Sequence, residues 1–174
     1  VLIALVHAYL IWSGDILFTY AVCGMIVFAC RNWSAKRLLL AGSVLFLVPM
    51  VLLVGAQLAL PMFGPETQAK VFGSFHPTPE KIQEHYEIFR GGWGVQMPVR
   101  VRNALAEHTV LLLLAVGGVA AGMMLVGMGL YRLGYLSGQR DRGSYVRLLL
   151  WTAPVGILLT ALGFWINFRQ GWRP

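Results

Sequence analysis

The chain has 174 residues, of which 57% are hydrophobic and only 12% are charged, and its mean hydropathy is +0.67. A soluble domain carries about 25% charged residues, so this composition excludes an ordinary soluble domain and indicates an integral membrane protein with the lipid bilayer as its partner. The formal net charge of +7 does not indicate a nucleic-acid partner, because the positive charges lie in short loops between long apolar runs, where membrane topology accounts for them.

The chain opens with two apolar stretches, Val1–Trp12 and Ile16–Cys30, separated by the turn signal Ser13-Gly14-Asp15. Each stretch is shorter than the roughly 20 residues that a spanning helix needs. One interpretation is a helical hairpin that turns near one membrane face, with Asp15 as the N-cap of its second helix. The other is one continuous span with Asp15 inside the bilayer. We favour the hairpin, because an aspartate at the centre of a span costs roughly 2.5–3.5 kcal/mol.

Three longer apolar runs predict further membrane segments: Leu38–Leu60, His108–Tyr131 and Leu148–Phe168. Ser34 is a candidate N-cap for the first of them. We therefore expect an all-α fold, a polytopic transmembrane helical bundle of about five membrane segments, with residues 1–174 forming a single membrane domain. The chain begins without Met inside an apolar run, with no charged segment before it. This start predicts a fragment of a longer protein rather than a signal peptide.

A polar insert, Pro61–Glu107, separates Leu38–Leu60 from His108–Tyr131. Within it, Thr78 and Pro79 are typical of a helix start, and Arg90 followed by glycine is typical of a helix end. The residues between them alternate with a helical period, so that one face is apolar and the opposite face is charged. The apolar face consists of Ile82, Tyr86 and Phe89. The insert is therefore predicted to carry a short amphipathic helix at the membrane surface.

The charges of the loops predict the orientation of the chain in the membrane. The two basic loops, Arg31–Arg37 and Arg132–Arg147, hold seven basic residues and one acidic residue, whereas the insert holds five of each. The positive-inside rule places both basic loops in the cytoplasm. The insert is then extracytoplasmic, and the turn with Asp15 and His7 faces the same side.

His7 and Asp15 are the candidate catalytic residues. A carboxylate beside an imidazole fixes the tautomer of the ring and supports general-base catalysis, as in many acyl-transfer sites. In a hairpin the two side chains meet across the turn, whereas in a continuous helix they share one face. The non-catalytic alternative is a helix cap together with a histidine at the membrane interface, and the spacing alone leaves both interpretations open.

A second polar cluster precedes the run that begins at His108, and it either completes a site with His7 and Asp15 or anchors the helix at the interface. The candidate substrate-binding residues are Arg90, Arg102, Glu107 and His108, with Arg100 in the same cluster. No metal site is expected, because neither the histidines nor Cys23 and Cys30 have a zinc-binding spacing. Gly118 and Gly122 form a small-xxx-small motif, which we interpret as a helix-packing feature.

Several stretches resemble the YeiB-like bacterial membrane proteins, whose C-terminal region is domain-of-unknown-function family 418. The first is His7-Ala8-Tyr9-Leu10-Ile11-Trp12 with Gly14-Asp15-Ile16-Leu17, followed by Tyr20-Ala21 and Gly24. The others are Phe89-Arg90-Gly91-Gly92-Trp93 and Leu125-Val126-Gly127-Met128 with Tyr131-Arg132-Leu133-Gly134. The resemblance covers most of the chain in matching order. Members of that family are longer than this chain, which also implies a fragment.

The resemblance implies an acyltransferase-like enzyme, because the family is grouped with membrane acyltransferases that move an acyl group from a cytoplasmic donor to an acceptor across the bilayer. It implies His7 as the base, and Asp15 as its partner or as a structural cap. We therefore expect part of an enzyme of the bacterial inner membrane that acts on an envelope acceptor, with acyl-CoA as the donor substrate and no bound cofactor. The alternative is a non-catalytic transporter or structural membrane protein.

Overall fold

The computed structural model of the chain describes residues 1–12, 14–75, 77–109, 116–169 and 171. Throughout these described residues the regular secondary structure is helical, and no strand occurs among them. The chain divides into two compact units, Val1–Leu130 and Tyr131–Pro174. The predicted all-α fold class is therefore confirmed for the part of the chain that the structure describes.

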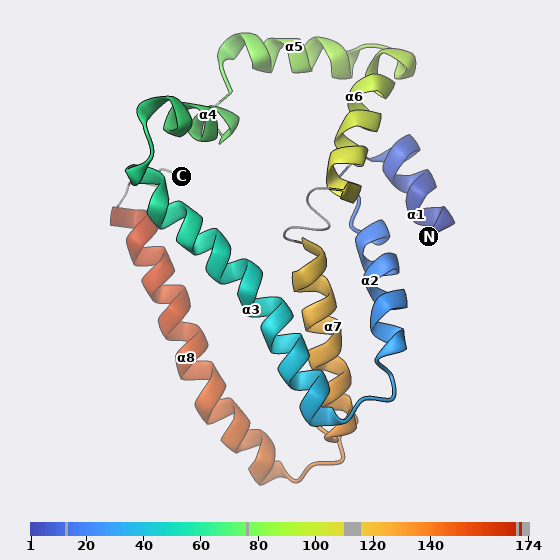
Figure 1. Cartoon of the computed structure of the whole chain (residues 1–174), viewed down its shortest axis with the longest axis vertical. Coiled ribbons are helices and arrows are strands. Elements are labelled where there is room, and N and C mark those ends of the chain that lie inside the picture. The colour runs from blue at the N-terminus through green and yellow to red at the C-terminus, as the bar shows by residue number, and fades with distance from the viewer. Residues whose placement is uncertain (13, 76, 110–115, 170, 172–174) are drawn as a thin grey trace. The chain divides into compact units, whose positions relative to one another are not determined.

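The first unit holds most of the helices, and the second is built on a single long one (Figure 1). In chain order they are α1 (Leu2–Val6), the π-helix η1 (His7–Ile11), α2 (Leu17–Ala29), α3 (Ala35–Ala59), the 3₁₀-helix η2 (Leu60–Met62), α4 (Pro65–Phe75), α5 (Pro79–Arg90), α6 (Trp93–Ala106), α7 (Gly117–Arg132) and α8 (Arg142–Arg169). Two of the helix starts are capped as predicted. The hydroxyl of Ser34 accepts a hydrogen bond from the backbone N–H of Arg37 at 3.4 Å, and that of Thr78 accepts one from Lys81 at 3.4 Å.

The buried core of the first unit joins α2, α3 and α7 through Val27, Leu38 and Leu125. The backbones of α3 and α7 approach closely where Gly42 faces Gly122. A Cβ atom added to Gly42 would lie 2.8 Å from the carbonyl oxygen of Gly122, and one added to Gly122 would lie 2.7 Å from that of Gly42. The small-xxx-small motif is therefore a packing feature, as predicted.

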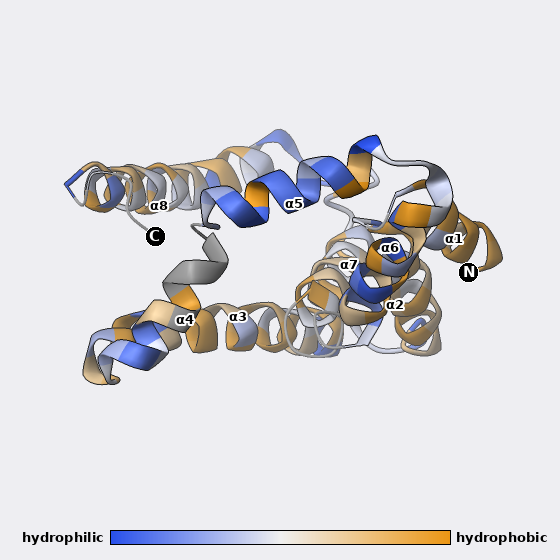
Figure 2. Cartoon of the chain, turned by 90° about the horizontal axis from the view of Figure 1, so that it is seen from above, coloured by the Kyte–Doolittle hydropathy of each residue, from blue (hydrophilic) through white to orange (hydrophobic). Residues whose placement is uncertain are grey.

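Two helical segments are long and apolar enough to cross a membrane: α3 together with η2 (Ala35–Met62) and α8 (Arg142–Arg169). Both are orange over much of their length in Figure 2, whereas α5 is largely blue. The core helix of a soluble protein is mostly buried, but α8 has no buried residue and α3 has two, Leu38 and Gly42. Leu2–Ile11 and Leu17–Ala29 are shorter apolar helical segments.

We predicted about five membrane segments, but only two helical segments among the described residues are long and apolar enough to span a membrane. Part of the predicted segment His108–Tyr131, residues 110–115, lies outside the described residues. Its described remainder contains α7. The five-segment bundle stays a prediction.

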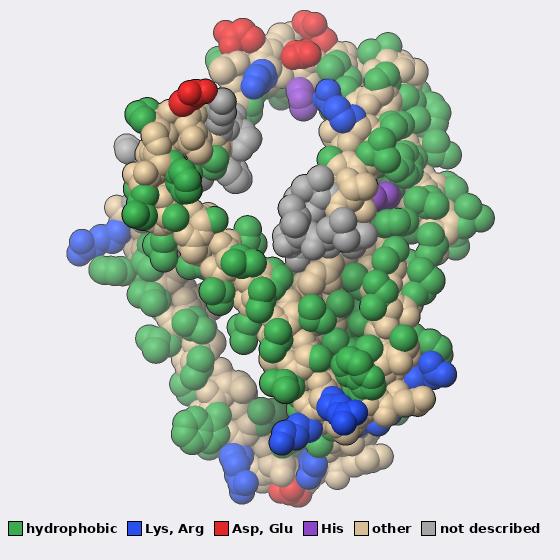
Figure 3. All heavy atoms as spheres, in the orientation of Figure 1, with side chains coloured by type: hydrophobic (Ala, Val, Ile, Leu, Met, Phe, Trp, Pro, Cys, Tyr) green, Lys and Arg blue, Asp and Glu red, His purple; other side chains and the backbone are tan. Residues whose placement is uncertain are grey.

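The insert contains three helices, α4, α5 and α6, where the sequence predicted one. The predicted amphipathic helix is α5, and its acidic side chains gather with that of α4 at one end of the first unit (Figure 3). The helix α6 was missed because it contains Pro98, which has no N–H to donate and usually ends a helix. The structure accommodates Pro98 within the helix.

The last long helix begins six residues earlier than predicted, at Arg142 instead of Leu148. The side chain of Asp141 caps it: one carboxylate oxygen accepts from the backbone N–H of Ser144 at 3.0 Å, and the other accepts from its hydroxyl at 2.7 Å. The hydroxyl and then the N–H of Ser144 lower the pKa of Asp141. Residues 142–147, predicted as part of a basic loop, are therefore the first turns of α8.

Candidate active site

His7 and Asp15 lie on either side of a break between two helical segments. The helix formed by α1 and η1 ends at Trp12, whose backbone is extended (φ −151°, ψ 118°), and α2 starts after Ile16. Figure 1 shows that the chain reverses its direction here. One continuous helix through this region is excluded, and the arrangement agrees with the hairpin interpretation.

Asp15 is almost fully buried, with 1% of its surface exposed. The N-cap residue of α2 is Ile16 rather than the predicted Asp15, but the carboxylate of Asp15 still binds the first backbone N–H groups of the helix. One carboxylate oxygen accepts from the N–H of Phe18 at 2.8 Å, and the other accepts from the N–H of Leu17 at 3.1 Å. Burial raises the pKa of Asp15, but these two backbone N–H groups and His7 together outweigh burial and lower the pKa below its usual value. The buried group is therefore a carboxylate.

The imidazole of His7 meets this carboxylate across the turn. Its Nδ1 lies 2.7 Å from the Asp15 oxygen that also accepts from Leu17. Because the carboxylate accepts at that oxygen, Nδ1 carries the proton, and a neutral ring has its lone pair on Nε2. The His7 side chain is 29% exposed, and the ring of Trp12 packs against it edge-on with the centroids 6.4 Å apart. The site thus presents an oriented imidazole to a partly open surface.

The helix α6 packs directly against η1. This packing brings the predicted polar cluster that ends at His108 close to His7 and Asp15. The two helices pack on each other between the clusters, and a small side chain of each, Ala8 of η1 and Ala104 of α6, is fully buried. The guanidinium of Arg100 donates to the carbonyl oxygen of Ile11, at the end of η1, over 2.6 Å. The residues of α6 therefore join His7 and Asp15 in one polar region.

His108, just after α6, is the best placed of the predicted substrate-binding residues. Its ring stacks on Phe18 at a centroid distance of 4.0 Å and an interplanar angle of 21°, and it meets Tyr9 edge-on at 5.6 Å. Its Nε2 is buried and has no hydrogen-bond partner among the residues that the structure describes. Phe18 is the residue whose N–H binds Asp15, so this second imidazole lies close to the first pair.

Glu107 also belongs electrostatically to this region. Burial raises its pKa, the neighbouring His108 opposes that change, and the negative charge of Asp15 raises the pKa further. A carboxyl group with a raised pKa keeps its proton at higher pH than usual, so Glu107 is suited to donate a hydrogen bond or a proton. These interactions favour the alternative in which the second cluster joins the site of His7 and Asp15 over that of an interface anchor alone.

The remaining predicted residues have other neighbours. The guanidinium of Arg90 lies over the ring of Tyr86, 5.6 Å from its centroid, within α5. Arg102 is exposed on α6. Their role in binding a substrate stays a prediction. Sequence reasoning missed Tyr9, Phe18 and Gln96, which contact the predicted residues, because their apolar or neutral side chains give no local signal of a site.

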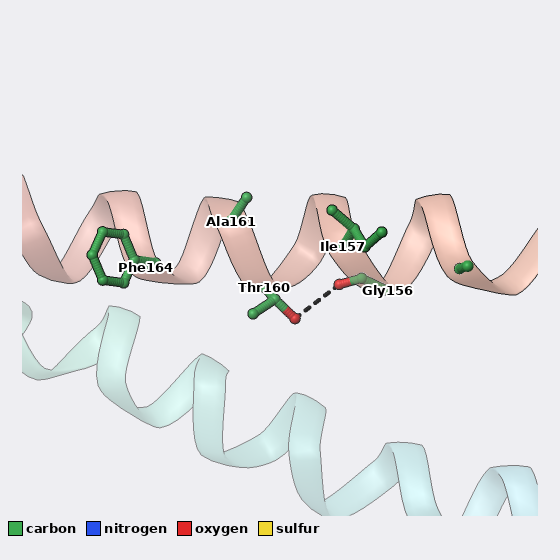
Figure 4. Close-up of a pocket in the computed structure, with 6 residues that line it drawn as sticks. Gly156, Ile157, Thr160, Ala161 and Phe164 are labelled. Carbon is green, nitrogen blue, oxygen red and sulfur yellow. Dashed lines mark hydrogen bonds between the residues drawn. The ribbon is translucent and has the colours of Figure 1, made fainter.

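The described residues hold no group of three potential metal ligands, and Cys23 and Cys30 are free. A shallow pocket lies along α8, lined by Ala153, Gly156, Ile157, Thr160, Ala161 and Phe164. Figure 4 shows these side chains along the helix and the hydroxyl of Thr160 bonded to the carbonyl of Gly156. The lining offers no charged group, so the pocket is an apolar helix face rather than a second site.

Comparison with known proteins gives one curated relative of this chain. It is 31% identical over 173 residues to the "Uncharacterized protein YeiB" of Escherichia coli strain K12, a match that covers 96% of this chain. The chain is similar to YeiB. This chain spans 40% of the length of YeiB. Any activity of a complete YeiB-like protein is therefore treated below as a proposal. No protein-family model matches the chain, and no solved structure matches it.

The buried carboxylate of Asp15 should make the free energy of unfolding of this YeiB-like chain depend on pH. Because the pKa of Asp15 is below 3.8 in the folded state, its contribution is complete above the unfolded pKa and is lost as the pH falls through the folded pKa. We expect Asp15→Asn to lower the free energy of unfolding at pH 7 by about 1–3 kcal/mol, since the amide nitrogen cannot accept from a backbone N–H. Below pH 3.8 the difference between wild type and variant should shrink.

Unfolding of both proteins in detergent micelles, followed by circular dichroism between pH 7 and pH 3, measures this difference. Glu107, whose pKa the charge of Asp15 raises, is replaced by glutamine in both proteins, and the remaining carboxylates titrate alike and cancel in the comparison. A constant difference across that range would mean that Asp15 is not the charged cap described above.

Proposed function

We propose that this chain is part of a multi-pass protein of the bacterial inner membrane that transfers an acyl group to an acceptor in the cell envelope. His7 is the general base and Asp15 orients it. The observation that carries the proposal is the 2.7 Å contact between His7 Nδ1 and a buried carboxylate that two backbone N–H groups also hold. A carboxylate fixed in this way leaves the opposite nitrogen of the ring to accept a proton.

The membrane setting is supported by the apolar surfaces of α3 and α8, which are long enough to cross a bilayer and little buried. The polar side chains of α8 also favour lipid contact. Thr152, Thr160 and Asn167 each donate to the carbonyl oxygen four residues earlier, over 2.8–2.9 Å. Polar groups in lipid must be satisfied within their own segment, whereas a transport pathway needs them free for the solute.

The reaction proposed is the transfer of an acyl group from a thioester such as acyl-CoA, which enters from the cytoplasmic side, to a hydroxyl group at the extracytoplasmic site of His7. The hydroxyl oxygen attacks the thioester carbonyl while its proton moves to Nε2 of His7. The carbon–oxygen bond forms, the carbon–sulfur bond breaks, and the thiolate takes the proton back from the imidazolium. The products are an ester and a free thiol, and Asp15 stabilises the transient imidazolium.

We assign the acceptor to the side of the site that His108 and Glu107 provide. Within the described part of the chain the buried Nε2 of His108 lacks a hydrogen-bond partner, and an unsatisfied buried group is stabilised when a ligand hydroxyl completes its hydrogen bond. The rings of Phe18 and Tyr9 hold the imidazole in place. Glu107, with its raised pKa, is a donor for the same ligand.

The full-length parent in nanodiscs, given acyl-CoA with a radiolabelled acyl group and a bacterial envelope extract, tests this function. We expect labelled ester and free CoA in equal amounts. A parent that forms no labelled ester with any acyl thioester, although it is folded and monodisperse, would exclude acyl transfer and favour the non-catalytic class of membrane protein.

The proposed orientation makes a separate prediction. In a background with Cys23 and Cys30 replaced by alanine, a membrane-impermeant maleimide applied to intact spheroplasts should label Glu84→Cys on α5. It should label Ser137→Cys, between α7 and α8, only after the membrane is permeabilised, because the basic loops face the cytoplasm. The reverse labelling pattern would overturn the orientation and place His7 on the cytoplasmic side.

A further inference from the structure

The end of the π-helix η1 is held by a side chain from a distant part of the chain. A π-helix, like an α-helix, leaves its last carbonyl groups without partners in the helix. The final bond of η1 runs from the N–H of Trp12 to the carbonyl of His7, and the carbonyl of Ile11 lies beyond it. Arg100 supplies the partner for Ile11, 89 residues away in sequence, and places a positive charge at the negative end of the helix.

Arg100 is itself fixed in one orientation. Its Nε and a terminal nitrogen donate to the side-chain oxygen of Gln96 over 3.2 and 2.9 Å. The side-chain nitrogen of Gln96 donates to the carbonyls of Phe89 and Gly91 over 3.0 Å each. A continuous chain of hydrogen bonds therefore runs from the α5–α6 corner through Gln96 and Arg100 to the end of η1.

This chain of bonds determines where His7 lies. Asp15 is tied to α2 by the N–H groups of Leu17 and Phe18, whereas His7 belongs to η1. The 2.7 Å contact between them thus requires η1 to keep its place relative to α2. The packing of α6 against η1 limits the separation of the two helices, and the bond from Arg100 to Ile11 limits sliding along the helix axis.

We infer that Arg100 is a positioning residue that holds η1 so that His7 faces Asp15, with Gln96 as the support that orients its guanidinium. The role in turnover rests on the proposed function, but the geometric role does not. Arginine suits the task because its planar group makes bonds in several directions at once, whereas lysine offers a single ammonium group.

The test is nitrogen NMR of the full-length parent in nanodiscs with ¹⁵N-labelled histidine, in which the His7 signals are assigned by their loss in His7→Gln. The wild type should show one tautomer, protonated at Nδ1. Arg100→Ala should show both tautomers in exchange, and Arg100→Lys should lie between the two. Arg102→Ala removes the same charge from the same helix at an exposed position, and it should leave the His7 signals of the wild type unchanged.

A single Nδ1-protonated tautomer in Arg100→Ala would overturn the inference, whatever the turnover. If Arg100→Ala does not fold, Gln96→Ala loosens the guanidinium and keeps its charge. This variant should show the same change to a smaller extent, and wild-type signals in it would equally overturn the inference.

Turnover measured on the same samples separates the two proposals. If the parent transfers acyl groups, Arg100→Ala should lower kcat by about 10²-fold with a smaller change in KM, because a small misplacement of the base slows the chemical step. A parent without acyl transfer whose His7 tautomer still depends on Arg100 would refute the proposed function and keep the positioning role.

Discussion

Replacement of His7 by alanine is expected to lower kcat for acyl transfer by about 10²–10⁴-fold, the usual contribution of a positioned general base. The substrate contacts assigned to His108 and Glu107 remain in this variant, so KM should change much less than kcat. The radiolabelled-ester assay on the full-length parent measures both constants. The expected loss is large because no second histidine can replace His7 as the base. Asp15 is buried, and among the described residues His7 is the one imidazole bonded to it.

Two further variants separate a catalytic from a structural role of His7. In His7→Gln the side-chain amide still donates to Asp15, but it cannot take up a proton at neutral pH. We expect this variant to unfold like the wild type and to be as inactive as His7→Ala. The matched control is His85→Ala on the exposed side of α5, which should keep full activity.

Full activity of a folded His7→Gln protein would show that the imidazole has only a structural role, as a hydrogen-bond donor that stabilises the turn. The site would then be a helix cap with an interfacial histidine, and the non-catalytic class of membrane protein would be favoured. Loss of activity in His85→Ala alone would move the base to α5 and leave the pair at the turn without a catalytic role.

The contact of His7 with Asp15 was predictable because its causes are local. A glycine beside an aspartate marks a turn, and the aspartate caps the helix that follows. A turn between two helices brings residues eight positions apart together. The start of α8 also has a local cause, because Asp141 is an N-cap type of residue directly before the helix. The start was predicted too late because the basic residues around Asp141 suggested a loop.

The contacts that complete the site were not predictable, because nothing local encodes them. The stacking of His108 on Phe18 and the bond from Arg100 to Ile11 join segments about 90 residues apart. The π-helical turn of η1 has no propensity signature, and Pro98 concealed α6. The sequence placed the candidate residues in two clusters, and only the packing of α6 on η1 brings the clusters together.

The second large effect is expected for a glycine-to-alanine substitution where α3 and α7 approach closely. Alanine normally stabilises a helix by about 1 kcal/mol relative to glycine. At Gly42 the sign should reverse, because the added Cβ would lie 2.8 Å from both the carbonyl oxygen of Gly122 and the backbone nitrogen of Val126. Those backbone atoms cannot move without separating the two helices. We expect Gly42→Ala to lower the free energy of unfolding by about 1–3 kcal/mol, as overpacking does.

Gly55→Ala is the matched control within α3, because its added Cβ meets no atom of the described residues within 4 Å. It should be neutral or slightly stabilising, and Gly127→Ala is the equivalent control in α7. Unfolding in mixed micelles with increasing dodecyl sulfate gives the three values on one scale. Equal stability of Gly42→Ala and Gly55→Ala would contradict the contact between α3 and α7.

Gly122→Ala tests the other side of the same contact, since its Cβ would lie 2.7 Å from the carbonyl oxygen of Gly42. If either alanine alone separates the two helices, the second alanine can be accommodated without further separation. The double variant Gly42→Ala with Gly122→Ala should therefore lose less stability than the sum of the two single losses. If the two stability losses were strictly additive, each glycine would stabilise its own helix independently, and the contact between the two backbones would not explain the losses.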